Sequence, residues 1–212
     1  MNALSLLVLS FFTVIALPSF AEISPEGIEY LRPDQKAYLE EGIAASEWPS
    51  YCPKTKELAL KRVTPPAGKL TKTEIIVVDK ARRLIHLMHN DQIIATYRMA
   101  LGTSPVGDKQ KEGDNKTPEG RYFIELKHPK SEYHLGLRLN YPNKIDIEEA
   151  FRKGIKDPGK DIMIHGLPNN WFKRKLIKHP NDWTRGCMAV TDSEIEQIYA
   201  TIDLGTYIEI CP

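Results

Sequence analysis

The fold is decided by the stretch TEIIVVDKARRLIHLMHNDQIIATYRMAL, residues 73–101. Three runs rich in β-branched and aliphatic residues follow one another here, at 74–79, 83–88 and 92–101. The pair Asn90-Asp91 separates the second run from the third, which is typical of a β-hairpin. The stretch therefore predicts three strands, of which the last two form a hairpin.

The chain beyond this stretch continues with strands and short helices. Thr191 and Glu194 have the spacing of a capping box, which predicts that a helix begins there. Many strands and few short helices predict a mainly β, β-rich α+β domain, built as a mainly antiparallel sandwich or barrel-like fold. The other expected strands are 120–126, 161–165 and 206–210, and the expected helices are 145–153 and 191–200.

The first 21 residues are similar to a secretory signal peptide. They contain no charged side chain, residues 4–17 are almost wholly apolar, and Ser19 and Ala21 place small residues before a cut after Ala21. This pattern predicts an exported, periplasmic protein of the cell envelope with no stable membrane insertion after processing. Because only the free amino terminus supplies positive charge, an uncleaved N-terminal anchor is the alternative.

Residues 22–70 are expected to form an N-terminal extension, and residues 71–212 the main domain. A helical pattern over 33–45 is followed by repeated proline breaks. The remaining chain is long enough for one domain with a sizeable core. The formal net charge is +1, which argues against a dedicated nucleic-acid binder.

The three cysteines are Cys52, Cys187 and Cys211. In an oxidising compartment this odd number means that one stays free or pairs with another chain. If Cys187 is a nucleophile, Cys52 and Cys211 remain as a possible pair. Two unpaired structural thiols are the alternative, because a sequence fixes no connectivity.

Two segments could carry chemistry. A strand over 162–164 delivers His165 to its exposed end, and Cys187 follows Gly186 on a tight segment before the capped helix. A cysteine nucleophile needs a group that stabilises its thiolate, and an imidazole can do this and later return the proton to a leaving amine. Gly186 allows a sharp turn, so its amide and that of Cys187 could face an oxyanion. The carbonyl of Gly166 is the nearest candidate to orient the imidazole.

In combination, four segments of the chain resemble the L,D-transpeptidase catalytic domain of the YkuD type. They are Leu101-Gly102, KTPEGRY at 116–122, IHG at 164–166 and TRGCM at 184–188, and the resemblance covers roughly residues 73–210. It implies an L,D-transpeptidase-like β-sandwich and a cysteine enzyme that needs no cofactor or metal. By the resemblance, Cys187 is the nucleophile, His165 the catalytic histidine, Gly186 the oxyanion-hole glycine and Thr184 the hydroxyl residue three before the cysteine.

The same segment departs from the usual family pattern at two positions. Ala189 stands where many members carry arginine, and Arg185 stands where histidine is common. This form is similar to a divergent branch that includes YafK-type proteins. Some members of that branch resemble hydrolases that cut the link between a murein peptide and an attached lipoprotein.

The resemblance implies a peptidoglycan-modifying acyltransferase, with peptidoglycan stem peptides as partners. Cys187 would form a thioester with a stem peptide and pass the acyl group to an amine. The first alternative is a hydrolase with the same pair, either an L,D-carboxypeptidase or an amidase that releases a murein-linked lipoprotein. The second is a non-catalytic wall-binding or zinc protein that uses His165, His179 and Cys187.

Three residues are candidates for substrate binding, namely Arg185, Tyr141 and His134. The segment 171–179, WFKRKLIKH, predicts a short amphipathic helix with a solvated basic face. The functional alternative for this segment is a flap beside the cleft, whose cations meet acidic groups of a wall peptide.

Overall fold

The computed structural model describes residues 50–66 and 70–212. The expected signal peptide and the expected helix at 33–45 lie outside the described residues. Among the described helices, none has the length and apolarity that a membrane crossing requires.

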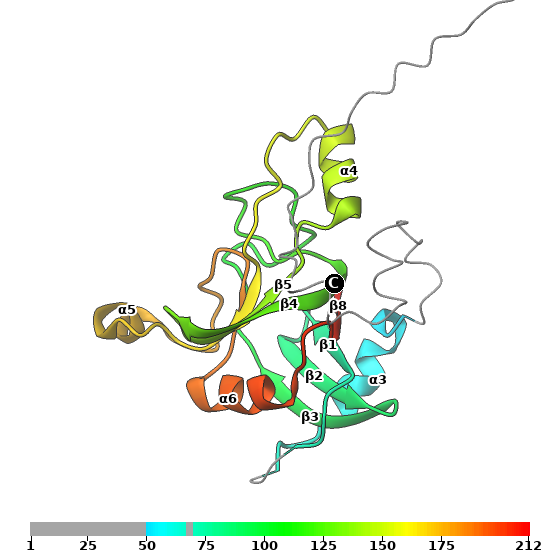
Figure 1. Cartoon of the computed structure of the whole chain (residues 1–212), viewed down its shortest axis with the longest axis vertical. Helices are drawn as coiled ribbons and strands as arrows, with labels where there is room; N and C mark the ends of the chain where they lie inside the picture. The colour runs from blue at the N-terminus through cyan, green and yellow to red at the C-terminus, as the bar shows by residue number, and fades with distance from the viewer. Residues whose placement is uncertain (1–49, 67–69) are drawn as a thin grey trace, which may run out of the picture.

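The strands form one hydrogen-bonded ladder in the order β3-β2-β1-β8-β4-β5-β6-β7 (Figure 1). The expected hairpin is confirmed, because β2 and β3 pair antiparallel from Leu84↔Arg98 to His89↔Gln92. The sheet is nevertheless mixed, since β1 pairs parallel with β8 and β6 pairs parallel with β7. The strands are β1 (Ile75–Asp79), β2 (Leu84–His89), β3 (Gln92–Arg98), β4 (Gly120–Ser131), β5 (His134–Leu139), β6 (Met163–His165), β7 (Met188–Ala189) and β8 (Tyr207–Cys211).

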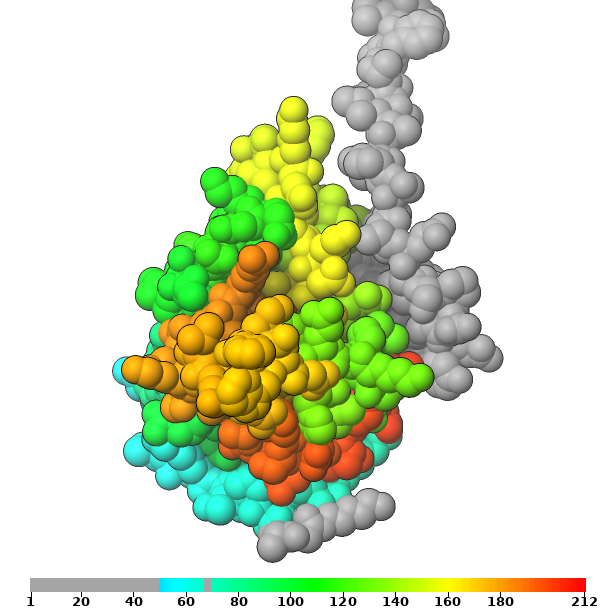
Figure 2. Space-filling view, turned by 90° about the vertical axis from the view of Figure 1, so that its left-hand side faces the viewer, coloured from blue at the N-terminus to red at the C-terminus, as the bar shows by residue number. Residues whose placement is uncertain are grey.

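The helices are short, as expected. Thr191 caps α6 with the predicted capping box, in which its side chain accepts from the amide of Glu194. α5 lies next to α6, joined to it by an ion pair between Arg174 and Asp192, and Figure 2 shows both on one face of the molecule. The helical segments are η2 (Cys52–Lys54), α3 (Thr55–Leu60), α4 (Lys144–Arg152), α5 (Trp171–Leu176) and α6 (Asp192–Thr201).

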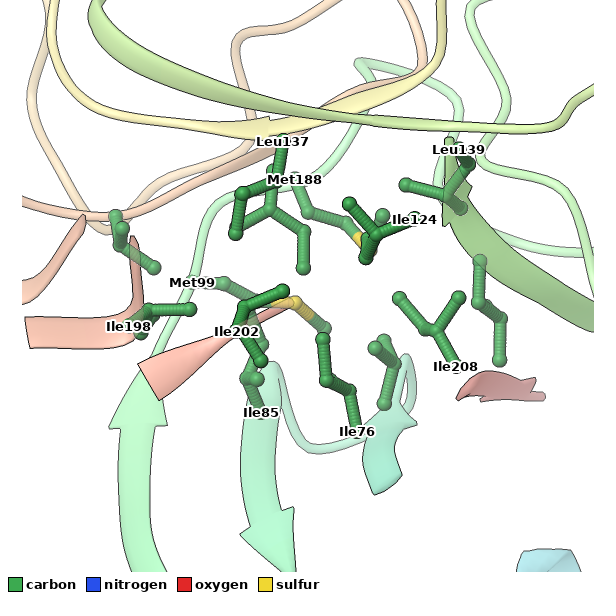
Figure 3. Close-up of a cluster of buried hydrophobic side chains, with 14 of the residues drawn as sticks. Ile76, Ile85, Met99, Ile124, Leu137, Leu139, Met188, Ile198, Ile202 and Ile208 are labelled. Carbon is green, nitrogen blue, oxygen red and sulfur yellow. The ribbon is translucent and has the colours of Figure 1, made fainter. Parts of the chain in front are cut away.

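Strand β4 joins the two halves of the sheet. Its first residues, Gly120 to Phe123, pair with β8, whereas the part from Ile124 to Ser131 pairs with β5 through two register irregularities. Such irregularities bend a strand, so the sheet folds over and encloses the core. Ile76 and Ile208 on one side and Leu137 on the other belong to this core, with α6 residues beside them (Figure 3). The expected mainly β, sandwich-like domain with short helices is thereby confirmed.

The N-terminal extension is attached to the last strand. Cys52 and Cys211 form a disulfide, with a Cα–Cα distance of 5.2 Å. This is the cysteine pair that the sequence left as possible. Beside it, the buried Glu209 accepts a hydrogen bond from the amide of Tyr51 at 2.6 Å and forms an ion pair with Arg121 at 3.2 Å. In the described part of the chain, Cys187 is the free cysteine.

Candidate active site

The pairing of β6 with β7 brings His165 and Cys187 to the same face of the sheet. Ile164 is the register partner of Met188, and His165 is the register partner of Ala189. Ile164 and Met188 both point into the core, where they are fully buried. Because side chains alternate along a strand, His165 and the residue before Met188 point to the opposite face. Cys187 and His165 are therefore diagonal neighbours across two paired strands.

The hydrogen bond of His165 defines which ring nitrogen is basic. Its Nδ1 lies 2.7 Å from the carbonyl oxygen of Gly166, the orienting partner expected from the sequence. A carbonyl oxygen only accepts, so Nδ1 carries the proton and Nε2 has a free lone pair. Burial lowers the pKa of His165 to about 4, and the bond to Gly166 raises it by less. The imidazole is consequently neutral at pH 7 and able to take a proton at Nε2.

Two aromatic rings cover the imidazole. The Tyr133 ring lies 4.4 Å from the His165 ring, centroid to centroid, and the Trp183 ring meets it edge-on at 5.7 Å. Trp183 is held in place by its amide, which donates to the carbonyl of Leu101 at 3.1 Å. These rings exclude water from His165, and desolvation is the cause of its low pKa.

The thiol of Cys187 lies at the start of β6. Its Sγ is 3.5 Å from the carbonyl oxygen of Asp161. Although Cys187 as a residue is partly exposed, burial of the thiol raises its pKa to about 11, against a smaller lowering by the Met163 backbone. The resting pair is therefore a neutral thiol and a neutral imidazole.

The turn before the nucleophile is fixed by Thr184. Its hydroxyl donates to the carbonyl of Cys187 at 2.7 Å and accepts from the amide of Gly186 at 3.1 Å. Gly186 has a φ of +132°, and a Cβ at this position would lie 2.5 Å from the carbonyl oxygen of Lys116. The turn thus requires glycine here. The amide of Gly186, expected at an oxyanion, is bonded to Thr184 instead.

The loop at 102–119 supports this turn from the other side. Gly102 bridges to Thr184, and a Cβ on Gly102 would lie 2.0 Å from the carbonyl oxygen of Asn115. The ammonium group of the buried Lys80 binds the loop through the carbonyls of Gly107 and Thr117 and the carboxylate of Glu119, at 2.7–2.9 Å. Burial lowers the pKa of Lys80, and Glu119 opposes this effect. A buried cation therefore anchors the loop that contacts the cysteine turn.

A cleft of about 720 Å³ opens over this site. Of the residues expected at the site, it brings together four, which are Cys187, His165, Thr184 and Arg185. The cleft is also lined by residues that had no assigned role, among them Tyr133, Trp183, Asp161 and Lys130, and by Lys173 and Leu176 of the segment considered as a possible flap beside the cleft.

Two substrate-binding candidates are corrected by the structure. Tyr141 is buried away from the cleft, and its hydroxyl donates to the carbonyl of Pro158 at 2.8 Å. His134 points toward α6, where its Nε2 lies 2.7 Å from the carboxylate of Glu196. Its neighbour Tyr133 occupies the position in the cleft. Tyr133 and His134 are adjacent, and the sequence alone does not show which of the two side chains faces the cleft.

Zinc coordination by His165, His179 and Cys187 is not favoured. Among the described residues, three ligand-type side chains come within mutual bonding reach only at Cys52, Glu209 and Cys211, where the two sulfurs are already joined.

Comparisons with known proteins agree with the fold and define the family. The model of the L,D-transpeptidase catalytic domain, YkuD, matches residues 73–210. The chain therefore belongs to this family, which acts on peptidoglycan.

Two relatives illustrate the similarity. "Putative L,D-transpeptidase YafK" of Escherichia coli K12 is 27% identical over 110 residues, which is 51% of this chain and 37% of that protein. The chain thus matches little more than a third of the length of this curated relative. The crystal structure of the helical cell shape determining protein Pgp2 from Campylobacter jejuni superposes with a TM-score of 0.50 at 22% identity. The superposition covers 76% of this chain and 56% of Pgp2.

Proposed function

We propose that this protein is a cell-envelope cysteine acyltransferase, an L,D-transpeptidase that acts on peptidoglycan stem peptides. One observation carries the proposal. The free thiol of Cys187 and the unprotonated Nε2 of His165 belong to diagonal neighbours on one face of the sheet, within one cleft. Membership of the family supports the same reaction.

The neutral resting pair defines how the reaction starts. As Sγ attacks the carbonyl carbon of a stem peptide, Nε2 of His165 takes the thiol proton, so the sulfur becomes nucleophilic at the moment of attack. The resulting imidazolium gives this proton to the leaving amine when the peptide C–N bond breaks, which leaves a thioester on Cys187. An incoming amine then attacks the thioester and loses a proton to Nε2. The C–S bond breaks as the new amide forms, and the imidazolium returns the proton to the sulfur, which restores the thiol.

The donors for the developing oxyanion follow from the turn. Because the Gly186 amide is bonded to the Thr184 hydroxyl, the Cys187 amide is the remaining candidate within the turn. Thr184 contributes by holding the turn through its bonds to the Cys187 carbonyl and the Gly186 amide. The Gly186 amide becomes a second donor if it turns from the Thr184 hydroxyl toward the substrate oxygen. Arg185 lines the cleft and is exposed, so its guanidinium is placed to meet a substrate carboxylate.

The test separates transfer from hydrolysis. The processed protein is incubated with tetrapeptide-bearing muropeptides, with and without a free amine acceptor, and with murein that carries linked lipoprotein. Mass analysis should show exchange or crosslinking that needs the acceptor, and C187A should show neither. Products that carry only water in place of the leaving group would establish the hydrolase alternative. Turnover by C187A would overturn both.

The proposed location is the periplasm, after removal of residues 1–21. N-terminal sequencing of the protein recovered from an envelope extract should give a chain that begins at Glu22. Recovery of a chain that begins at Met1 in the membrane fraction would favour the uncleaved anchor instead.

A further inference from the structure

Helix α5 stands away from the body of the molecule. None of its residues is buried, and Figure 1 shows it projecting to one side of the sheet. Its first turn is capped by the side chain of Asn170, which accepts from the amide of Lys173, and an ion pair of Arg174 with Asp192 attaches it to α6. The helix is thus held firmly at one side and exposed on the other.

The exposed side of α5 carries large apolar side chains. Trp171 is 57% exposed, Phe172 73% and Leu176 83%. The two aromatic rings touch edge to face at 4.9 Å, and the ammonium group of Lys175 lies 3.8 Å above the Trp171 ring. Clustered exposed apolar side chains of this size mark an interaction site more often than scattered ones do.

The charge around this cluster has one sign. Residues 171–179 contain four basic residues and no acidic one. Arg174 is paired with Asp192, which leaves Lys173, Lys175 and Lys178 for a partner. Aromatic and leucine side chains that alternate with lysines are typical of segments that lie in the headgroup region of an anionic membrane.

We propose that α5 is a contact site for the surface of an anionic phospholipid bilayer. Trp171 and Phe172 enter the headgroup region, and Lys175 and Lys178 lie against lipid phosphates. A stable protein interface buries about 1,000 Å² or more with close shape complementarity, which a projecting six-residue helix does not supply. A bilayer requires no such complementarity, because its headgroups rearrange around a small convex cluster.

The position of α5 gives the contact a functional consequence. Lys173 and Leu176 line the cleft that contains Cys187, so a bilayer against α5 lies beside the mouth of the active site. The contact would present the enzyme to substrates held at a membrane surface. The inference does not depend on the reaction proposed for Cys187.

The test measures binding of the processed protein, with its N-terminus confirmed by sequencing, to vesicles. Vesicles of phosphatidylcholine mixed with phosphatidylglycerol are compared with vesicles of phosphatidylcholine alone by sedimentation. We expect binding to the anionic vesicles only, with a loss of about tenfold in W171S/F172S. K175E/K178E should lose at least about tenfold, since each basic residue near an anionic surface contributes about 1 kcal/mol. Raised salt should also weaken binding.

Matched control variants replace two exposed apolar residues by serine, or two exposed cations by glutamate, outside α5. L60S/F151S removes two large side chains that are 88% and 68% exposed, and K56E/R152E reverses two exposed cations; both should bind as the wild type does. Turnover of a soluble muropeptide by W171S/F172S should equal that of the wild type, which verifies the fold. Equal binding by W171S/F172S and the wild type, or no vesicle binding at all, would overturn the proposal. So would selective loss of binding to purified murein sacculi, which would assign α5 to the wall polymer.

Discussion

Cys187 and Cys211 lie in two regions in which the same side chain has opposite roles, a free thiol in one and a disulfide in the other. Cys211 ends a central strand, is almost fully buried and is joined to Cys52 of the N-terminal extension. Cys187 lies on a turn before a two-residue strand, and its thiol faces a backbone carbonyl. One region uses a cysteine to fix the chain, and the other keeps a thiol free within a built cleft. The difference comes from what packs around each sulfur.

The largest expected effect separates the two regions directly. C187A should reduce turnover to background while the unfolding midpoint stays near that of the wild type, because a small side chain is replaced by a smaller one. C52S and C211S should instead lower the free energy of unfolding by about 2–5 kcal/mol while turnover persists at low temperature. Muropeptide assays and denaturant titrations of the three variants provide the check. Wild-type turnover in C187A would contradict the assignment.

The next effect concerns the glycine of the turn. G186A should lose most activity, since a Cβ would lie 2.5 Å from the Lys116 carbonyl and a φ of +132° is strained for alanine. The matched control is G113A, because Gly113 also has a positive φ, +77°, but its Cβ would meet nothing within 4 Å. G113A should cost about 1–2 kcal/mol of stability because of its positive φ, and little turnover. Equal turnover in the two variants would mean that the close approach to Lys116 is unimportant.

A smaller effect is expected from the rings that cover His165. Y133A should admit water to the imidazole and raise the pKa of His165 from about 4 toward its ordinary 6.5. The acid limb of the pH dependence of kcat/KM should then move to higher pH, whereas Y133F should keep the wild-type profile. An unmoved acid limb in Y133A would show that Tyr133 does not shield the base.

The buried histidines predict how stability responds to acid. Both His165 and His86 have a folded pKa lowered to about 4 by burial, so below pH 6.5 the unfolded chain binds protons that the native state does not. Their contribution is present above pH 6.5 and is lost as pH falls toward 4, by up to about 3 kcal/mol for each. H165Q should remove about half of this acid sensitivity, as measured by denaturant titration at several pH values. If the free energy of unfolding of H165Q falls with pH as steeply as that of the wild type, the low pKa of His165 is contradicted.

The smallest effect belongs to Arg185, which is exposed at the edge of the cleft. Since a guanidinium stays protonated, it cannot act as the base. R185A should raise KM by a few fold while Cys187 still reacts with an alkylating agent at the wild-type rate. Loss of alkylation in R185A, with wild-type alkylation in H165A, would reverse the two roles.

The features that the sequence predicted well are local ones. The hairpin of β2 and β3, the Thr191 capping box and the hydrogen bond of His165 to its neighbour Gly166 each depend on a few adjacent residues. The residues that escaped prediction depend on distant ones. Trp183 and Tyr133 meet at His165 because β5, β6 and the cysteine turn converge there.

The corrected predictions have the same physical origin. Tyr141 is a residue type that suits a substrate groove, yet its hydroxyl donates to the carbonyl of Pro158 inside the fold. The sequence indicated that the Gly186 amide could face an oxyanion, and in the structure this amide donates to the Thr184 hydroxyl, two residues earlier in the chain. In both cases the role of a polar group depends on its hydrogen-bond partner in the folded protein. A pattern of residue types in the sequence does not identify that partner.

The place of β8 in the sheet sets the order in which the domain can assemble. β8 lies between β1 and β4, although it follows every other strand in the chain. Until residues 207–211 arrive, β3-β2-β1 and β4-β5-β6-β7 are joined only by the isolated bridges of Ala100 with Ala189 and of Gly102 with Thr184 among the described residues. Pairing of strands so far apart in sequence is slow and comes late in folding. β1 and β4 therefore each keep an unpaired edge until the last strand of the domain is available.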